Sequence, residues 1–475
     1  MAQLSIESPT QETQQPTENL SLPANLKIAF FHLGSGMADV LTTGVWNRIM
    51  VSDLQFAATP IALLIGLRYF LAPLGIWSGR LSDERKFLGF RRMFWIGLGR
   101  ALMVASTFIL GFVTADIARS GVLGSATSPQ WLMIGLSLLM FSLGSAISGT
   151  TFLALVYDRS PEHQRGRTVG VVWTFLLLGY TFAGILFGAL LPAHAEGDTS
   201  TNLLYTPDTL RNLFLIAGVI FAVVWVISMW GEEKFNAPIP KVKREEEVSR
   251  GIIADLKLVW LHPSMRFFLF YLALSMFFAF SQDAILEPFA GDVFDMPARV
   301  TNRFSTYWGT TAILGTIFFI WYSRRNKRLT NTFMSQMGVV VLAIAFALFA
   351  LASFANIRQL VTPGLLTLGI GLGIWNVGTL GLMLDMSPLG RAGTFLGFWT
   401  LVVTFARGAG VSSGGIVYDS VRAITDSIPS GYGAVFVIGS LGLVVALVCL
   451  NRINMLAFKR KEPNDSATIF AGAMD

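Results

Sequence analysis

Long apolar runs separated by short polar segments follow one another along almost the whole chain. Each run is long enough to cross roughly 30 Å of hydrocarbon at about 1.5 Å per helical residue. The pattern predicts twelve membrane spans, at residues 26–47, 57–78, 93–115, 131–156, 168–191, 211–231, 264–288, 304–323, 332–354, 362–384, 394–418 and 431–451. We therefore expect an all-α membrane protein.

The polar segments divide these spans into two groups of six. The longest internal polar segment, residues 232–263, carries a run of charged residues and is predicted to be a cytoplasmic linker. It separates an N-terminal half at 26–231 from a C-terminal half at 264–452. Residues 1–25 are predicted to be a disordered tail and residues 453–475 a cytoplasmic tail, because both lack a sustained apolar pattern.

An internal repeat supports this division, because the fifth span matches the eleventh at one shift of 226 positions. Parallel six-helix halves of this kind build the major facilitator fold. We therefore predict twelve transmembrane helices in two parallel six-helix halves. The residues Arg165, Thr168, Trp173, Thr174, Ala183, Gly184 and Gly188 align with Arg391, Thr394, Trp399, Thr400, Ala409, Gly410 and Gly414.

Composition and charge agree with a membrane protein. The chain is 53% hydrophobic and 13% charged, whereas a soluble protein is about 25% charged. With the predicted spans, 24 of the 35 Lys and Arg residues fall on one side, seven on the other and four within spans. Basic residues accumulate in cytoplasmic loops, so both termini are predicted to be cytoplasmic. This topology accounts for the net charge of +6, and we expect no nucleic-acid partner.

Several kinds of chemistry are not supported by the sequence. It contains neither a Gly-x-x-x-x-Gly-Lys-Ser/Thr phosphate loop nor a His-Glu-x-x-His pair. One cysteine and four histidines leave no pattern for a cysteine-based metal cluster. We therefore expect neither an enzyme nor a metal site.

Charged residues inside the predicted spans are the first candidates for function. They include Asp39, Arg68, Arg100 and Arg407. A charge at mid-bilayer costs at least about 2.5 to 3.5 kcal/mol unless it is paired or hydrated, so each should have a partner. We expect Asp39 to pair with Arg68, and the four residues to belong to an intramembrane charge network.

Asp283 and Glu287 extend this network, four residues apart in the seventh predicted span. In an unbroken helix, positions i and i+4 share one face, so both carboxylates should point at the same neighbour. Asp283 lies about nineteen residues from the cytoplasmic start of the span, roughly 28 Å along it. Two interpretations remain open: contact with a ligand, or closure of an outer gate against Arg299 or Arg303.

A cytoplasmic motif follows the second span, where Gly79-Arg-Leu-Ser-Asp83 precedes several basic residues. It resembles the loop signature of the major facilitator superfamily, although Glu84 stands where that signature has a basic residue. The resemblance implies a gating role, in which Asp83 and nearby arginines latch helices together. The candidate gating residues are Gly79, Asp83, Arg85, Arg91, Asp158 and Arg165.

The segment Gln282-Asp-Ala-Ile-Leu-Glu-Pro288 resembles the seventh-span signature of the bacteriochlorophyll delivery (PucC-like) family of that superfamily. The chain departs from the signature immediately afterwards, with Phe289-Ala290-Gly291 where the family has an aromatic residue followed by two glycines. The resemblance implies a membrane assembly factor of a phototroph, in the thylakoid or cytoplasmic membrane. Such a factor binds chlorophyll or bacteriochlorophyll and delivers it to light-harvesting or photosystem polypeptides, with pigment-synthesis enzymes as further partners.

A pigment site requires a flat apolar wall and an axial ligand such as a neutral imidazole. Of the four histidines, His32 alone lies in a predicted span, and Gly36 at i+4 is expected to open a flat area beside it. His32 is therefore the candidate pigment ligand. The alternatives are that His32 is an interior hydrogen-bonded residue, that Gly34 and Gly36 merely pack against the fifth span, or that Asn47 or Gln282 supplies the ligand.

A second class of function also fits these residues. A proton-coupled secondary transporter of a small amphipathic solute would use Asp39, or Asp283 and Glu287, as its titrating groups. A scaffold without transport is a third possibility. The 38 phenylalanines do not separate these functions, because pigment contact and lipid contact both favour Phe.

Overall fold

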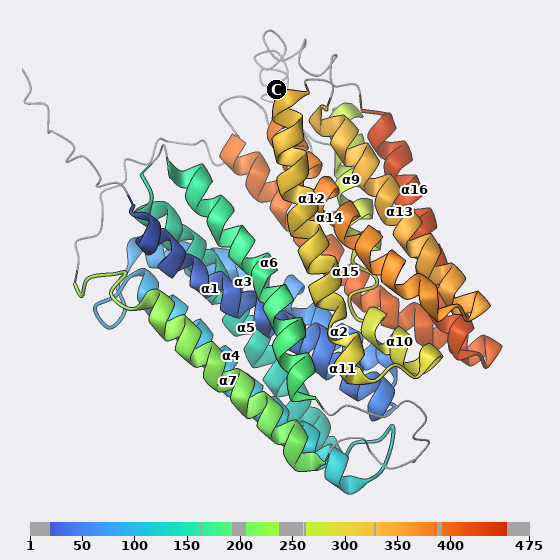
Figure 1. Ribbon diagram of the computed structural model, residues 1–475. Helices are drawn as coiled ribbons and strands as arrows, with labels where there is room; N and C mark the ends of the chain where they lie inside the picture. Colours follow the sequence, from blue (N-terminus) through green and yellow to red (C-terminus); the bar gives the residue numbers. More distant parts are fainter. Residues whose placement is uncertain are drawn as a thin grey trace, which may run out of the picture.

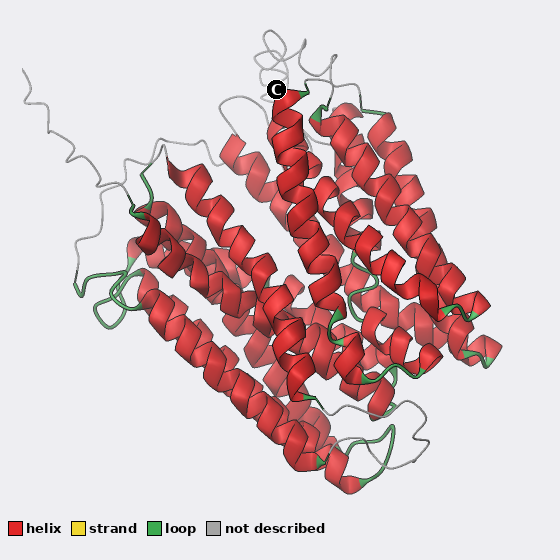
Figure 2. Cartoon of the chain, in the orientation of Figure 1, coloured by secondary structure: helices red, strands yellow, loops and turns green. Residues whose placement is uncertain are grey.

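The computed structural model describes residues 20–161, 164–191, 206–236, 260, 263–326, 329–386 and 392–453. Within these ranges the regular structure is helical, apart from one isolated bridge between Phe87 and Phe90 (Figure 2). Most of the predicted tails and of the predicted linker lies outside the described residues. The predicted disordered tail at 1–25 extends too far, because residues 22–25 form the start of α1.

The N-terminal half begins with a span that changes helix type. Its α-helical part continues into two π-helical segments, and the second span is broken at Leu71, two residues before Pro73. Proline lacks an N–H, so it is favoured at the start of a new helix. The elements are α1 (Leu22–Val40), η1 (Leu41–Trp46), η2 (Ile49–Asp53), α2 (Ala58–Phe70), α3 (Ala72–Glu84), α4 (Arg92–Ser120), α5 (Ser128–Arg159), α6 (Arg165–Leu190) and α7 (Pro207–Met229).

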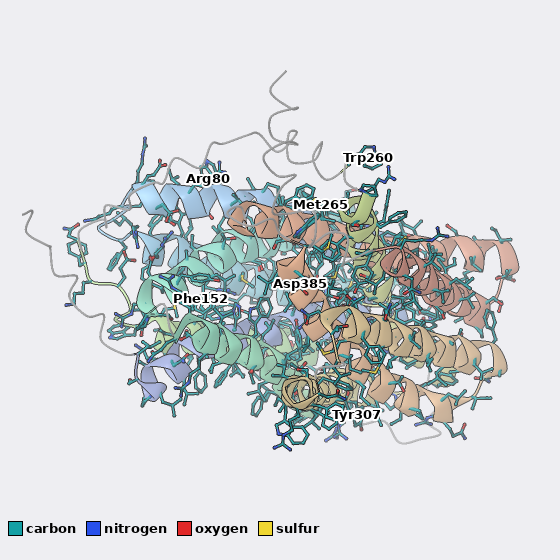
Figure 3. The ribbon with its side chains drawn as sticks, turned by 90° about the horizontal axis from the view of Figure 1, so that it is seen from above. Arg80, Phe152, Trp260, Met265, Tyr307 and Asp385 are labelled. Atoms are coloured by element: carbon teal, nitrogen blue, oxygen red, sulfur yellow. The ribbon has the colours of Figure 1, made fainter. Side chains whose placement is uncertain are left out.

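The C-terminal half repeats this order of spans, and its first span is also interrupted. The elements are α9 (Pro263–Ala279), α10 (Leu286–Phe294), α11 (Ala298–Thr301), α12 (Phe304–Arg325), α13 (Asn331–Ala355), the short 3-10 helix η4 (Arg358–Leu360), α14 (Val361–Asp385), α15 (Ala392–Thr425) and α16 (Ile428–Asn451). Figure 3 shows the two halves side by side, with Phe152 in the first and Met265 and Asp385 in the second.

The described helices confirm the predicted all-α membrane fold. Nine helical stretches in this part of the chain are long and apolar enough to cross a membrane. The other three predicted spans correspond to α1 with its π segments, to α9 with α10, and to the more polar α12. The seventh span is not the continuous helix predicted over 264–288, because the chain forms turns between Ala279 and Leu286.

The two halves pack closely through small residues on α6 and α15. A Cβ atom at Gly184 of α6 would collide with Thr306 of α12, and one at Gly415 of α15 would lie 2.6 Å from Ala58 O of α2. Small residues let helix backbones approach in lipid, where no hydrophobic drive brings them together. The predicted pair Gly184 and Gly188 packs across the halves. Its repeat, Gly410 and Gly414, packs within the C-terminal half against α9 and the turn after it.

These contacts join the halves at one end of the bundle. We call this the outer end, and the opposite end, where α1 starts and α16 finishes, the cytoplasmic end, following the predicted topology. On one side the contacts extend inward to Phe70 and Phe405, and on the other to Leu177 and Gly309. Figure 1 shows α6 and α12 converging toward the outer end and separating toward the cytoplasmic end. Among the described residues, the contacts between the halves therefore gather at the outer end of the bundle.

Candidate functional site

Two aspartate–arginine pairs lie where the contact between the halves ends. Asp39 of α1 forms an ion pair with Arg68 of α2, as expected from the sequence. Asp283, in the turn between α9 and α10, accepts a hydrogen bond from Arg407 Nη2 of α15 at 3.0 Å. Each pair joins two helices of one half and neutralises its own charge, as a location inside the membrane requires.

Aromatic residues connect the two pairs across the halves. Tyr180 Oη of α6 donates to Asp39 Oδ2 at 3.2 Å, and Arg68 Nη2 donates to Tyr69 Oη at 2.5 Å. The guanidinium of Arg407 lies 5.0 Å from the ring centre of Tyr69, a residue of the opposite half. Stacking a cation on an aromatic ring stabilises a desolvated charge. We call Asp39, Arg68, Tyr69, Tyr180, Asp283 and Arg407 the central cluster.

The interruption after α9 overturns the expected arrangement of Asp283 and Glu287. They do not share a helix face, because the chain leaves the helix before Asp283 and resumes it at Leu286. Asp283 points to Arg407 rather than to Arg299 or Arg303. Glu287 lies in the first turn of α10, is 7% exposed and packs beside Gly44 of η1, without a salt bridge among the described residues. A helix N-terminus favours a carboxylate at that position.

Hydrogen bonds to the main chain close the outer end above the cluster. Asn47 Nδ2 donates to Ala284 O at 2.9 Å, and Ser52 Oγ donates to Pro288 O at 3.2 Å. Asp419 of α15 accepts from the backbone N–H groups at the start of α2, that of Ala58 at 3.2 Å and that of Thr59 at 2.6 Å. The C-terminal half thus caps a helix of the N-terminal half. Asn47, an alternative pigment ligand, is used in this closure.

His32 lies in an aromatic environment on α1. Its ring centre is 4.9 Å from that of Phe152 and 5.7 Å from that of Trp173, which meets it edge-on. The residue is 8% exposed, and its Nδ1 atom has no hydrogen-bond partner. Buried nitrogens without partners are uncommon, so this imidazole is one of the few side chains of α1 whose hydrogen-bonding capacity the protein leaves unused.

The flat area expected beside His32 is filled by another helix. A Cβ atom at Gly36 would lie 3.1 Å from Gly179 Cα and would collide with Leu176 O, both on α6. The glycine therefore serves close packing of α1 on α6, and the predicted surface for a ring at Gly36 is wrong. A flat ligand can reach His32 only from another direction.

Arg100 does not join the central cluster, contrary to the prediction. Its guanidinium lies 3.9 Å from the ring centre of Phe31 and 4.5 Å from that of Trp225, and Nη1 donates to Met103 Sδ at 3.1 Å. Among the described residues it forms no ion pair. Two aromatic faces therefore stabilise this charge in place of a carboxylate.

The candidate gating motif forms an ion network within the N-terminal half. Arg92 of α4 pairs with Asp83 of α3 at 2.5 Å and with Asp158 of α5 at 3.1 Å, and Arg91 also pairs with Asp158. Arg92 Nη1 donates in addition to the carbonyl of Gly79 at 3.4 Å. The network ties three helices together at the cytoplasmic end.

Two residues of the predicted motif stand outside this network. Arg85 is exposed, and the guanidinium of Arg165 lies 5.9 Å from the ring centre of Tyr157. The predictions from the sequence did not include Glu233. Its carboxylate accepts hydrogen bonds from the backbone N–H groups of Arg91, Arg92 and Met93 at 2.7 to 2.9 Å. One feature of the sequence could have indicated such a partner. Arg91 occupies the cap position of α4 and its side chain cannot accept hydrogen bonds, so the first N–H groups of this helix need an acceptor from elsewhere.

Two six-helix halves that close at one end over buried ion pairs define a membrane protein of the major facilitator fold. The structure of a bacterial homolog to the human lysosomal transporter Spinster, in an inward-facing and unoccupied conformation, superposes with a TM-score of 0.67 at 15% identity. The match covers 91% of this chain and 98% of that one.

The chain belongs to the PUCC protein family, whose model matches residues 45–458. It is 29% identical over 421 residues to Protein PucC of Rhodovulum sulfidophilum, covering 87% of this chain and 89% of that protein. It is 27% identical over 429 residues to a protein of Rhodobacter capsulatus named bacteriochlorophyll synthase 44.5 kDa chain, covering 88% and 92%.

Proposed function

We propose that this protein binds chlorophyll or bacteriochlorophyll within the membrane of a phototroph and delivers it to light-harvesting or photosystem polypeptides. Family membership supports a role connected with photosynthesis, and one relative carries bacteriochlorophyll in its name. Binding and transfer involve no chemical conversion of the pigment. Both termini are proposed to be cytoplasmic, and the membrane to be the thylakoid or the cytoplasmic membrane.

The observation that carries the proposal is the unpartnered imidazole of His32. A neutral imidazole with a free nitrogen is a suitable axial ligand for the magnesium of a chlorin ring. The surrounding rings of Phe152 and Trp173 offer the flat apolar contacts that such a ring needs. Because α6 covers Gly36, a chlorin ring can be placed at His32 only if it approaches from the side of Trp173.

The central cluster has a different part in this proposal. Its two ion pairs are neutral overall and lie at the inner limit of the contact between the halves. We assign it to holding the outer end closed, so that the pigment site communicates with the cytoplasmic half of the membrane. Pigment-synthesis enzymes and recipient polypeptides would then be partners on that side.

A proton-coupled transporter of a small amphipathic solute is the second candidate. The observation that favours it is the presence of buried carboxylates, Asp39, Asp283 and Glu287, along the boundary between the halves. Titratable groups at such a boundary can couple proton binding to a change of conformation.

The experiment that tests the proposal is an absorption spectrum of the protein purified from a phototrophic host in mild detergent. Stoichiometric red-absorbing pigment is expected, and His32→Leu should remove most of it. His262→Leu, which changes a histidine outside the predicted spans, is the matched control and should retain the pigment. A colourless wild-type protein that moves protons with a solute, and stops doing so in Asp39→Asn, would establish the transporter instead.

A further inference from the structure

The contact between α6 and α12 is a row of residues that stops halfway through the membrane. From the outer end inward, Gly188 of α6 meets Arg299 and Arg303, just before α12, and Gly184 and Thr181 meet α12 itself. Thr181 Oγ1 lies 3.4 Å from Thr310 Oγ1, and a Cβ atom at Gly309 would lie 3.8 Å from Leu177 O. Below this point the two rows diverge (Figure 1).

The same two helix faces continue toward the cytoplasm without a partner among the described residues. On α6 the row continues through the exposed Thr174 and Gly170, and on α12 through Leu314, Ile317 and Trp321, all of them exposed. About twelve residues of α6 and about fifteen of α12 lie below the last contact, which corresponds to roughly 18 to 22 Å of helix. The opening is therefore taller than a chlorin macrocycle.

This opening borders the lipid. Tyr307 of α12, three residues outward of Thr310, lies at the edge of the molecule in the view from above, so this face of the helix is directed away from the other helices (Figure 3). At the cytoplasmic end, the guanidinium of Arg325 stacks 4.2 Å from the ring centre of Trp321. Tryptophan and arginine together are typical of the headgroup level of a membrane. A molecule dissolved in the inner leaflet thus faces an apolar, aromatic edge.

Trp173 connects the opening to His32. It lies on the cytoplasmic half of α6, is 49% exposed, and contacts the His32 ring with its edge. Its counterpart in the internal repeat, Trp399, is fully buried and packs against Phe268 with ring centres 5.2 Å apart. The two tryptophans occupy equivalent places, yet only the one beside His32 has room to swing outward.

We propose that the cytoplasmic halves of α6 and α12 form a lateral opening to the inner leaflet, with Trp173 as the movable lid between this opening and His32. The molecule that passes is a flat, amphipathic ring dissolved in the membrane, which enters edge-first from the lipid rather than from the aqueous face. This inference rests on the proposed pigment binding at His32 and adds the route.

The route is tested by blocking the opening. In a Cys449→Ser background, which removes the single native cysteine, Thr174→Cys is labelled with a bulky maleimide. Leu74→Cys on α3, an exposed position in the second span, carries the same label as the control. Uptake of chlorophyll a from liposomes is followed by absorbance. The label at position 174 should slow uptake at least tenfold, and the label at 74 should change it less than twofold.

The lid is tested by removing it. Trp173→Ala should accelerate both uptake and release of chlorophyll a at least threefold. Trp77→Ala on α3, which removes a tryptophan that is 55% exposed, should change neither rate. Unchanged rates in Trp173→Ala, or equal slowing by the two labels, would overturn the lateral route while pigment binding stands. If the wild-type protein binds neither chlorophyll a nor bacteriochlorophyll a, the proposed function fails and the route with it.

Discussion

Replacing Arg407 with Met should destabilise the protein and change the way its halves meet. The substitution keeps an apolar side chain of similar length but leaves Asp283 without its cation. Both side chains are largely buried, with exposures of 25% for Arg407 and 14% for Asp283. Breaking a buried pair costs about 3 to 5 kcal/mol.

We expect a smaller loss in this case, for a structural reason. Gln282 Nε2 also donates to Asp283 Oδ1, at 2.7 Å, so the carboxylate keeps one partner. The free energy of unfolding should therefore fall by about 2 to 3 kcal/mol, which is less than the full cost of breaking a buried pair. Unfolding by a denaturing detergent, followed by the loss of helical signal, measures this quantity.

The decisive comparison is a double-mutant cycle. Asp283→Asn alone should also destabilise, whereas Asp283→Asn with Arg407→Met should be at least about 1 kcal/mol more stable than the sum of the two single effects, because the two residues contact each other. Arg119→Met, at an exposed position near the end of α4, is the control for loss of an arginine. Strictly additive losses would refute the argument that the pair acts as a unit.

Three further predictions concern packing and capping. Asp419→Ala should cost about 0.5 to 2 kcal/mol of unfolding free energy, because the start of α2 loses its cap; an unchanged detergent midpoint would contradict this. Gly184→Leu should push the halves apart at the outer end and expose engineered cysteines there to a water-soluble maleimide, whereas Gly170→Leu, with no atom within 4 Å of its Cβ position, should leave labelling unchanged. Arg92→Gln should lower the thermal midpoint through loss of two ion pairs, and Arg85→Gln should not; equal effects would argue against the network.

The sequence was sufficient for the architecture, since apolar run length and the distribution of basic residues both follow directly from the properties of a bilayer. The pairing of Asp39 with Arg68 was also predictable, because an isolated charge at that depth is costly. The partner of Asp283 was not predictable from the sequence. The face-sharing rule assumes an unbroken helix, whereas the chain leaves the helix between Ala279 and Leu286.

Gly36 was the second position at which the structure differed from the prediction. The absence of a Cβ at Gly36 is equally compatible with an open surface and with a close helix contact, and only the position of Gly179 on α6 decides between them. Arg100 was misplaced for a related reason, because its partners are the aromatic faces of Phe31 and Trp225 rather than a carboxylate. Contacts between distant segments of this kind leave no local pattern in a single sequence.

Several of the hydrogen bonds that close the outer end have a peptide group as one partner. Carbonyls at Ala284 and Pro288 accept from the first span, and amides at Ala58 and Thr59 donate to Asp419. Peptide groups do not ionise in the physiological range, so these main-chain partners keep their hydrogen-bonding capacity when the pH changes. We therefore expect the outer end to stay closed while the protein exchanges its cargo repeatedly through one leaflet.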